Sequence, residues 1–447
     1  MIKYTRLFIT ILLAVCVLEA KSQSTATTSS PYSRYGIGDV TPQWLPQNIG
    51  MGGISTATNN ISGYNTINLI NPAAYGAISY TVIDAGVTTN LLTLRNDSTK
   101  QRTGNTKLSH LSFAFPVTQH SALGLGLVPY SDLGYHFTQT FSKGYGSGSK
   151  ADTNAVNQIY SGDGSLSKAY LGYGFAIGKH LTIGGNVSYI FGNLKQYQDT
   201  EIPNLANFLN SRIEEDNHVG GFNFDYGAQY TIDFSTTRHL ILGYSASVGN
   251  KINVQHTFIV SQYTYDSSNN QNNPVDSLIS TQDPKAKIQL PRINHFGIAY
   301  QKDPALDHGP SYLVGVDYTM GNWSDLTIAG AAQGLQNSKM FNIGGQIIPN
   351  PNALSNHLLL MSYQLGFIYE DTYLNVNNTN IKSHAFTFGL GIPLPHDRAT
   401  SAFYKVNFAA EIGQRGTISN GLVKENYVNF HLAFTLNDRW FQRYKFE

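Results

Sequence analysis

Two-residue alternation of side chains is the feature of the sequence that most constrains its fold. In residues 171–177 every odd-numbered residue is large and apolar, and every even-numbered residue is glycine or alanine. The alternation resumes after the short connection 178–180 and recurs at 385–394 and 427–436. Because successive side chains of a β-strand point to opposite faces, these segments predict strands with one large apolar face and one small, polar face.

Such segments recur from residue 80 onward, and the connections between them are alternately short and long. A transmembrane barrel has this layout, with tight periplasmic turns and longer outer loops. We therefore predict an all-β, antiparallel transmembrane barrel of about 14 strands with both termini in the periplasm. The predicted strands are 80–94, 107–117, 122–141, 166–178, 181–197, 219–234, 239–261, 285–301, 311–324, 338–348, 358–370, 382–394, 402–414 and 427–436.

Charge favours this barrel over a soluble protein. Only 13% of the residues are charged, with 29 Lys and Arg against 28 Asp and Glu, where about 25% is usual for soluble domains. The alternative, a secreted β-sandwich or solenoid, would carry more charge and would need a second sheet to cover its aromatic rings. The balanced charge offers no footprint for nucleic acid, so no nucleic-acid partner is expected.

Residues 1–22 have the layout of a secretory signal peptide. Lys3 and Arg6 precede an apolar run, and small residues flank the expected cleavage site. This predicts export to the outer membrane of a double-membraned bacterium. The single cysteine, Cys16, lies in the apolar run, so we expect a mature chain without disulfides or thiolate metal sites. Lipid attachment at Cys16 is the alternative, which the preceding valine disfavours.

Residues 23–79 lack the strand alternation and are rich in Gly, Asn and Thr. A segment of this length before a closed barrel must lie in the periplasm or fold into the lumen, and a wide lumen has to be filled. We predict an N-terminal hatch at 23–79, a barrel at 80–437 and a periplasmic C-terminal tail at 438–447.

Several short motifs follow one another in a characteristic order, beginning with Gly50-Met51-Gly52-Gly53, Asn71-Pro72-Ala73 and a hairpin at 117–134. In this order they resemble the FadL family of outer-membrane transporters for long-chain fatty acids and other hydrophobic compounds. The first two look like that family's hatch signature, and 117–134 looks like its second hairpin. Residues 312–326, 341–350 and 383–394 follow its later strands. The resemblance implies passive uptake of long-chain fatty acids or aromatic hydrocarbons, which leave the barrel sideways into the surrounding lipid, without catalysis, and closure of the hatch by Asn71, Pro72 and Ala73.

Pro129 interrupts the predicted third strand, 122–141. Proline cannot donate to a sheet ladder, so it marks an edge, a bulge or a gap. In FadL-like barrels a kink in this strand opens the wall sideways to the bilayer, and the resemblance places that lateral opening at Pro129, Tyr130 and Gly134. Gly134 permits unusual dihedral angles nearby. An ordinary β-bulge at the barrel rim is the alternative.

Aromatic residues receive two expected roles. Trp44, Tyr64 and Tyr75 of the hatch are expected to face the lumen and its ligand. Interfacial girdles are expected to include Tyr318, Trp323, Tyr363 and Tyr369.

Motifs for enzymes and metals fail on inspection. Residues 243–247 lack the final glycine of a nucleophile elbow, and the 13 histidines show no HExxH spacing. We therefore expect no enzyme activity, no metal and no cofactor. A Ser/His pair assembled across strands around His384 or His431, as in a barrel lipase, is the alternative.

A binding or assembly role is the main rival to uptake. Some FadL-like barrels serve protein secretion across the outer membrane as carrier, shuttle or assembly subunits. The basic, aromatic tail at 438–447 favours this role as a docking peptide for a periplasmic or secretion partner; a solvated terminus is its alternative. A purely structural barrel is the third possibility.

Overall fold

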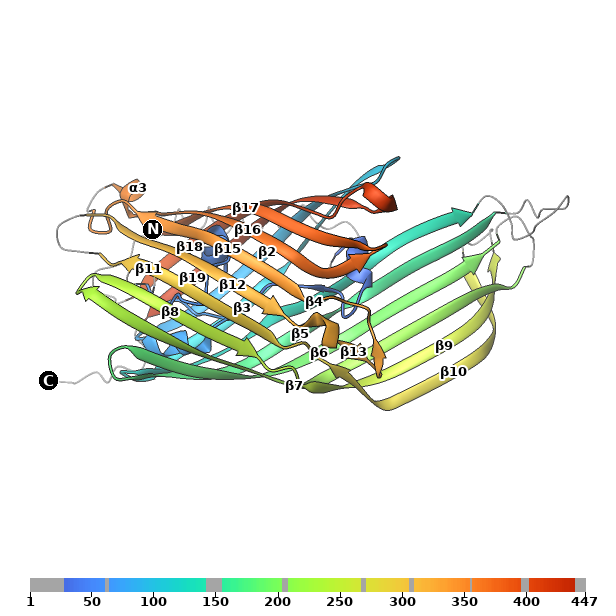
Figure 1. The fold of residues 1–447 in the computed structure, drawn as a ribbon, viewed down its shortest axis with the longest axis horizontal. Helices are drawn as coiled ribbons and strands as arrows, with labels where there is room; N and C mark the ends of the chain where they lie inside the picture. The colour runs from blue at the N-terminus through green and yellow to red at the C-terminus, as the bar shows by residue number, and fades with distance from the viewer. Residues whose placement is uncertain are drawn as a thin grey trace, which may run out of the picture.

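The computed structural model describes residues 28–60, 64–141, 155–202, 208–266, 271–304, 309–353, 356–394 and 402–438. Within these ranges the strands form one antiparallel sheet, which closes on itself where β19 pairs with β2 from Lys424↔Arg95 to Asp438↔Thr81. The wall contains 14 strands (Figure 1), because β8 with β9, and β10 with β11, each form one interrupted strand. The predicted all-β, antiparallel barrel is confirmed. The predicted signal peptide at 1–22 and residues 439–447 of the predicted tail lie outside the described residues.

The wall strands are β2 (Thr81–Arg95), β3 (Lys100–Thr118), β4 (Ser121–Phe141), β5 (Val156–Ile177), β6 (Leu181–Glu201), β7 (Asn210–Ser235), β8 (Arg238–Ser247), β9 (Lys251–Asp266), β10 (Gln271–Gln289), β11 (Ile293–Lys302), β12 (Ser311–Gly321), β15 (Ser338–Ile348), β16 (Ser362–Val376), β17 (Thr379–Pro393), β18 (Phe403–Arg415) and β19 (Lys424–Asp438). The short elements are η1 (Pro31–Arg34), β1 (Asp39–Val40), α2 (Pro46–Gly50), η2 (Pro72–Ala77), η3 (Trp323–Asp325), β13 (Thr327–Ile328), β14 (Ala331–Ala332), α3 (His357–Leu360) and η4 (Ser419–Gly421).

The large apolar residues of the alternating pattern point outward. Leu171 is 54% exposed and Phe175 is 38% exposed, whereas Gly172 and Gly174 between them face side chains and backbone inside the barrel. The girdle expectation is wrong for Trp323, which is buried in η3 and stacked on Tyr373 with 4.5 Å between ring centroids. Among the described residues no helix is both long enough and apolar enough to cross a membrane.

At one end of the barrel, several strands are longer than predicted. The predicted long loops 142–165, 198–218 and 262–284 contain further strand, because β5 begins at Val156, β6 runs to Glu201 and β10 begins at Gln271. These polar stretches have no apolar alternation to reveal them. Instead, cross-strand pairs such as Arg212 Nε with Asp199 Oδ1, at 2.7 Å, join them.

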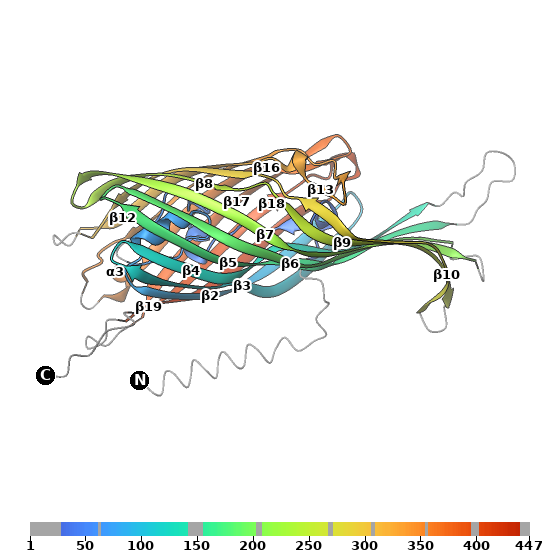
Figure 2. The same ribbon diagram turned by 90° about the horizontal axis from the view of Figure 1, so that it is seen from below.

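The additional strand forms a six-stranded sheet that projects beyond the barrel rim (Figure 2). We call it the sheet extension, and its strand order is β4-β5-β6-β7-β9-β10. It consists of residues 136–141, 156–161, 197–201, 210–214, 259–266 and 271–280.

The described residues that precede β2, 28–60 and 64–79, lie inside the barrel, where Figure 1 shows them in blue between the strands. Every residue of 45–58 and of 71–76 is buried. The small face of the wall allows this close fit. A Cβ on Gly174 would lie 2.6 Å from the Pro72 carbonyl oxygen, and a Cβ on Gly52, which has φ +72°, would lie 2.7 Å from the Ile343 carbonyl oxygen. The backbone of the N-terminal segment therefore rests directly on the backbone of the wall.

This fit predicts that substitutions at two adjacent glycines of β6 differ in their effect on stability. A Cβ on Gly184 would lie 2.5 Å from the Pro72 carbonyl carbon, whereas a Cβ on Gly185 would meet nothing nearer than the Asp225 carbonyl oxygen at 3.5 Å. Gly184→Val should destabilise the protein by at least about 1–3 kcal/mol through overpacking. Urea unfolding of the protein in lipid vesicles measures this loss. Gly185→Val is the matched control, and equal loss from both variants would contradict the predicted contact.

Candidate functional site

The barrel wall is interrupted between β3 and β4. These strands pair only from Leu111↔Leu127 to Thr118↔Ser121, although β4 continues to Phe141 against β5. The register of β4 on β5 shifts between Pro129 and Ser131, which leaves Tyr130 in a bulge. Pro129 and Tyr130 thus lie at the start of a break in the wall, so both the gap and the bulge considered for this position are present. A lateral exit for ligands at this break stays a prediction.

Residues 29–43, which we call the wall segment, lie along this break. Its strand β1 pairs with β4, with Asp39 opposite Asp132 and Val40 opposite Ser131. Ser131 Oγ also donates to the Ile37 carbonyl oxygen at 2.7 Å. The wall segment therefore provides β4 with an antiparallel neighbour where β3 no longer does.

The wall segment also reaches Gly134 and β3. The Gly134 N–H donates to Ser33 Oγ at 3.1 Å, and that hydroxyl is 3.2 Å from the Gly134 carbonyl oxygen. Gly134 is not among the described glycines with positive φ. On the other side of the break, Ser29 Oγ lies 3.1 Å from Thr103 Oγ1 of β3. Lys107 of β3 forms an ion pair with Asp132 across the break.

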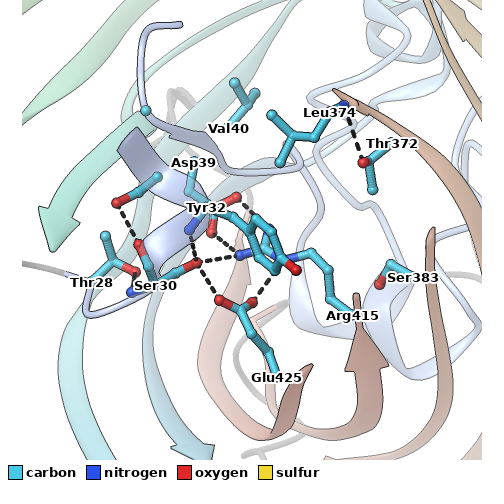
Figure 3. Close-up of polar contacts among 12 residues, drawn as sticks. Thr28, Ser30, Tyr32, Asp39, Val40, Thr372, Leu374, Ser383, Arg415 and Glu425 are labelled. Carbon is cyan, nitrogen blue, oxygen red and sulfur yellow. Dashed lines mark hydrogen bonds and ion pairs between the residues drawn. The ribbon is translucent and has the colours of Figure 1, made fainter. Parts of the chain in front are cut away.

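A partly buried ion-pair cluster fixes the wall segment to strands β18 and β19 (Figure 3). Arg415 of β18 contacts Asp39 Oδ1 through Nη1 at 2.7 Å and Glu425 Oε2 through Nε at 2.7 Å. Its Nη2 donates to Ser30 Oγ at 2.7 Å, and that hydroxyl donates to Glu425 Oε1 at 2.5 Å. Nη1 and Nη2 of Arg415 also contact the two carboxylate oxygens of Asp39, at 2.7 and 3.1 Å, which is the bidentate and strong form of such a contact.

Tyr32 extends the cluster. Its ring centroid lies 5.5 Å from Arg415 Cζ, and its hydroxyl donates to the Val423 carbonyl oxygen at 2.6 Å. Burial, followed by the nearby Glu425 carboxylate, raises the pKa of Tyr32. The phenol therefore stays protonated and keeps donating at physiological pH.

Residues 44–79, the lumen segment, are held by polar side chains of the wall. Asp317 Oδ2 accepts from the N–H groups of Ser55 and Thr56, both at 2.8 Å. Gln229 Nε2 donates to the carbonyl oxygens of Thr56 at 3.1 Å and Thr58 at 3.0 Å. The Asp317 contacts satisfy two buried backbone N–H groups, and Gln229 adds a second donor to carbonyl oxygens that also accept from Asn71 and Asn68.

The predicted hatch residues lie at the centre of the lumen segment. Asn71 caps η2 by accepting from the Ala73 N–H at 3.1 Å, and its Nδ2 donates to the Thr56 carbonyl oxygen at 2.8 Å. Pro72 and Ala73 are buried against the glycines of β5 and β6. The structure brings the three residues together, and their role in opening or closing a hatch stays a prediction.

The three aromatic residues expected to face a ligand differ in their surroundings. Tyr75 is fully buried against Gly124 and Gly172, and burial raises its pKa well above the usual value. Trp44 covers Gly53. Tyr64 lines a cavity of about 210 Å³ together with Tyr80 and Phe403. Only Tyr64 of the three borders this cavity, and ligand binding there stays a prediction.

Sequence reasoning missed the residues that hold the N-terminal segment. Arg415, Glu425 and Asp317 are charged residues in strands with few charges, and this signal could have identified them. His431, considered above for a Ser/His pair, has its Nδ1 2.9 Å from Thr88 Oγ1. In the described part of the chain no group of three or more His, Cys, Asp and Glu residues could hold a metal ion.

Comparisons with known proteins identify both a family and a fold. The family model described as BamG matches residues 1–447. No protein with a curated description matches the chain.

Solved structures similar to this one include a Pseudomonas aeruginosa FadL homologue, with a TM-score of 0.58 and 11% identity over 90% of this chain and 100% of that one. The Pseudomonas putida toluene transporter TodX has a TM-score of 0.58 and 14% identity over 90% and 99% of the two chains. The Ralstonia pickettii toluene transporter TbuX has a TM-score of 0.54 and 13% identity over 89% and 98%. At these identities the likeness establishes the fold, an outer-membrane β-barrel with an N-terminal segment inside.

The partly buried cluster predicts that Arg415→Met loosens the wall segment. Removing the guanidinium leaves the buried Glu425 and the partly exposed Asp39 without their partner, and loss of the buried pair alone costs roughly 3–5 kcal/mol. Amide hydrogen exchange of residues 29–43 in the folded protein should become faster. Lys382→Met on the adjacent strand is the control, because its ion pair with Asp371 joins two exposed side chains. Unchanged exchange in the Arg415 variant would contradict the clamping role.

Proposed function

The chain belongs to the BamG family, and from this membership we propose that it is a membrane-embedded subunit of the machinery that assembles β-barrel proteins in the outer membrane. In this proposal the barrel serves as a scaffold that holds partner proteins and catalyses no reaction. The match of the family model over residues 1–447 is the observation that carries the proposal.

The packing of the N-terminal segment supports a scaffold. A channel would require this segment to leave the lumen or to rearrange within it. The partly buried cluster of Arg415 with Asp39 and Glu425 would then lose its partners, and the Asp317 carboxylate would lose two backbone donors. Breaking one buried ion pair alone costs several kcal/mol. A lumen filled in this way suits a subunit whose surface, and not its interior, is used.

Uptake of hydrophobic small molecules is the second candidate. It is favoured by the break between β3 and β4 beside Pro129 and by the fold shared with two toluene transporters. In this alternative a fatty acid or aromatic hydrocarbon would pass from the lumen into the lipid. Burial of each methylene there is favourable by about 0.8 kcal/mol.

The C-terminal tail is the proposed contact for a periplasmic partner. It is basic and aromatic, with Arg439, Trp440, Phe441, Arg443 and Tyr444 among its residues. Because Asp438 pairs with Thr81 in the strand pairing that closes the barrel, a deletion that spares the barrel begins at residue 439.

The test is isolation of the tagged protein from native outer membranes in mild detergent, followed by detection of the central barrel-assembly protein. We expect the two proteins to co-isolate, and removal of 439–447 to reduce recovery at least about tenfold, which corresponds to about 1.4 kcal/mol of lost binding. Replacement of Trp440, Phe441 and Tyr444 by serine, with the charges retained, separates aromatic from electrostatic contributions.

Transport assays test the alternative, a transporter. Vesicles containing the purified protein or its Pro129→Val variant are tested for uptake of a labelled long-chain fatty acid and of toluene. The scaffold proposal predicts no uptake above protein-free vesicles. Uptake that the Pro129 variant abolishes, combined with failure to co-isolate, would replace the scaffold by a transporter.

A further inference from the structure

The sheet extension has two outer edges with different chemistry. One edge is β4 at residues 135–141, and the other is β10 at residues 271–287; each range includes residues of the same strand next to the sheet extension. Among the described residues neither edge pairs with a further strand. Such edges carry unpaired N–H and C=O groups that can bind another chain. Edge strands of natural proteins usually carry features that prevent this.

The β10 edge carries these protective features. Its pairing with β9 contains three register shifts, two of which adjoin Pro274 and Asp283. A second proline, Pro284, and the charged, exposed Asp276 and Lys285 lie along the same strand. Proline, bulges and charge are the means by which proteins block strand addition.

The β4 edge carries none of them. Residues 135–141 read YHFTQTF, with no proline and no Asp, Glu, Lys or Arg. The register of β4 on β5 is continuous from Ser131 to Phe141. His136 and residues 138–141 are exposed, and Tyr, Phe and Thr are strong strand formers. One edge of the same sheet is thus protected, while the other remains competent for pairing.

The wall segment shows which backbone groups of β4 point outward. Both the N–H and the C=O of Gly134 meet Ser33 Oγ, on the side away from β5. Because these groups alternate along a strand, His136, Thr138 and Thr140 also direct theirs outward. Earlier in β4, Ser131 and Asp132 of the same edge already pair with β1.

We propose that residues 135–141 of β4 bind an extended, uncharged segment of a partner protein by β-strand addition, in continuation of β1. The class of partner, another subunit of the outer-membrane assembly machinery, rests on the proposed function. The absence of charge on the edge calls for an uncharged partner segment. Backbone hydrogen bonds provide the affinity in this mode of recognition.

Strand direction selects such a partner over a second copy of the chain. Two copies inserted in the same membrane with the same orientation would both run β4 from the barrel toward the sheet extension, so their edges would meet in parallel. Every described pairing in this sheet, including that of β1 with β4, is antiparallel. A partner segment running back toward the membrane completes the pattern.

Hydrogen exchange on the intact protein tests the proposal. The exchange of the His136, Thr138 and Thr140 amides is measured in the purified protein and in the complex isolated through the central assembly subunit. We expect these amides to exchange at least about 100-fold more slowly in the complex. Amides 280–283 on the protected β10 edge should exchange equally in both samples.

A pair of variants separates pairing from folding. Thr138→Pro removes one outward N–H and leaves the bonds to β5 in place; it should reduce recovery of the complex at least about tenfold, or 1.4 kcal/mol. Thr138→Val keeps the N–H and should bind normally. Both variants should retain the heat-resistant mobility of the folded barrel on gels.

The possible results have distinct meanings. A complex with unchanged exchange at β4 overturns this inference and leaves the proposed function intact. Slow exchange in the isolated monomer would indicate that the chain covers its own edge, and slow exchange that accompanies a dimer would indicate a second copy; either result overturns the proposed partner. Failure to isolate any complex rejects the proposed function together with this partner.

Discussion

Direct contact between the backbone of the wall and the backbone of the N-terminal segment is the constraint on which the structure depends. A wide barrel leaves a lumen that side chains of the wall alone cannot fill. Here the inward face is small, with Gly174 and Gly184 lying against Pro72 and with Gly344 and Gly366 against residues 51 and 52. The lumen is thus filled by the N-terminal segment and not by side chains of the wall. The large residues of the same strands are directed outward, where a membrane barrel requires them.

The same arrangement accounts for the break in the wall. Once β3 and β4 separate beyond Leu127, the backbone groups of β4 need partners inside a membrane. The wall segment provides them through β1 and Ser33, and Arg415 fixes the other side of that segment. A feature that could serve as a lateral passage is therefore occupied by the protein itself. This occupancy, with the family membership, favours a scaffold over a channel.

Much of the fold could be predicted from the sequence because outward and inward side chains alternate regularly along the wall strands. Strict alternation located the wall strands, since lipid outside and packed chain inside impose opposite requirements on successive residues. The sheet extension was missed because neither face of residues 197–201 or 210–214 is a lipid face, so alternation is lost while pairing continues. Trp323 was misplaced because its burial depends on a ring, Tyr373, that lies fifty residues away in the chain. The Arg415 cluster joins residues 30, 39, 415 and 425, and no local pattern connects them.

A disulfide between the wall segment and β4 tests the central claim most directly. Val40 and Ser131 are cross-strand partners, which places their Cβ atoms close to the separation that a disulfide requires. The only cysteine in the sequence is Cys16, within the predicted signal peptide. In cells whose sole copy is the Val40→Cys/Ser131→Cys variant, the amounts of other outer-membrane barrel proteins are compared with and without reductant. A fixed scaffold predicts wild-type amounts in both conditions. Loss of those proteins under oxidising conditions, with recovery on reduction, would show that the N-terminal segment must move and would contradict the account.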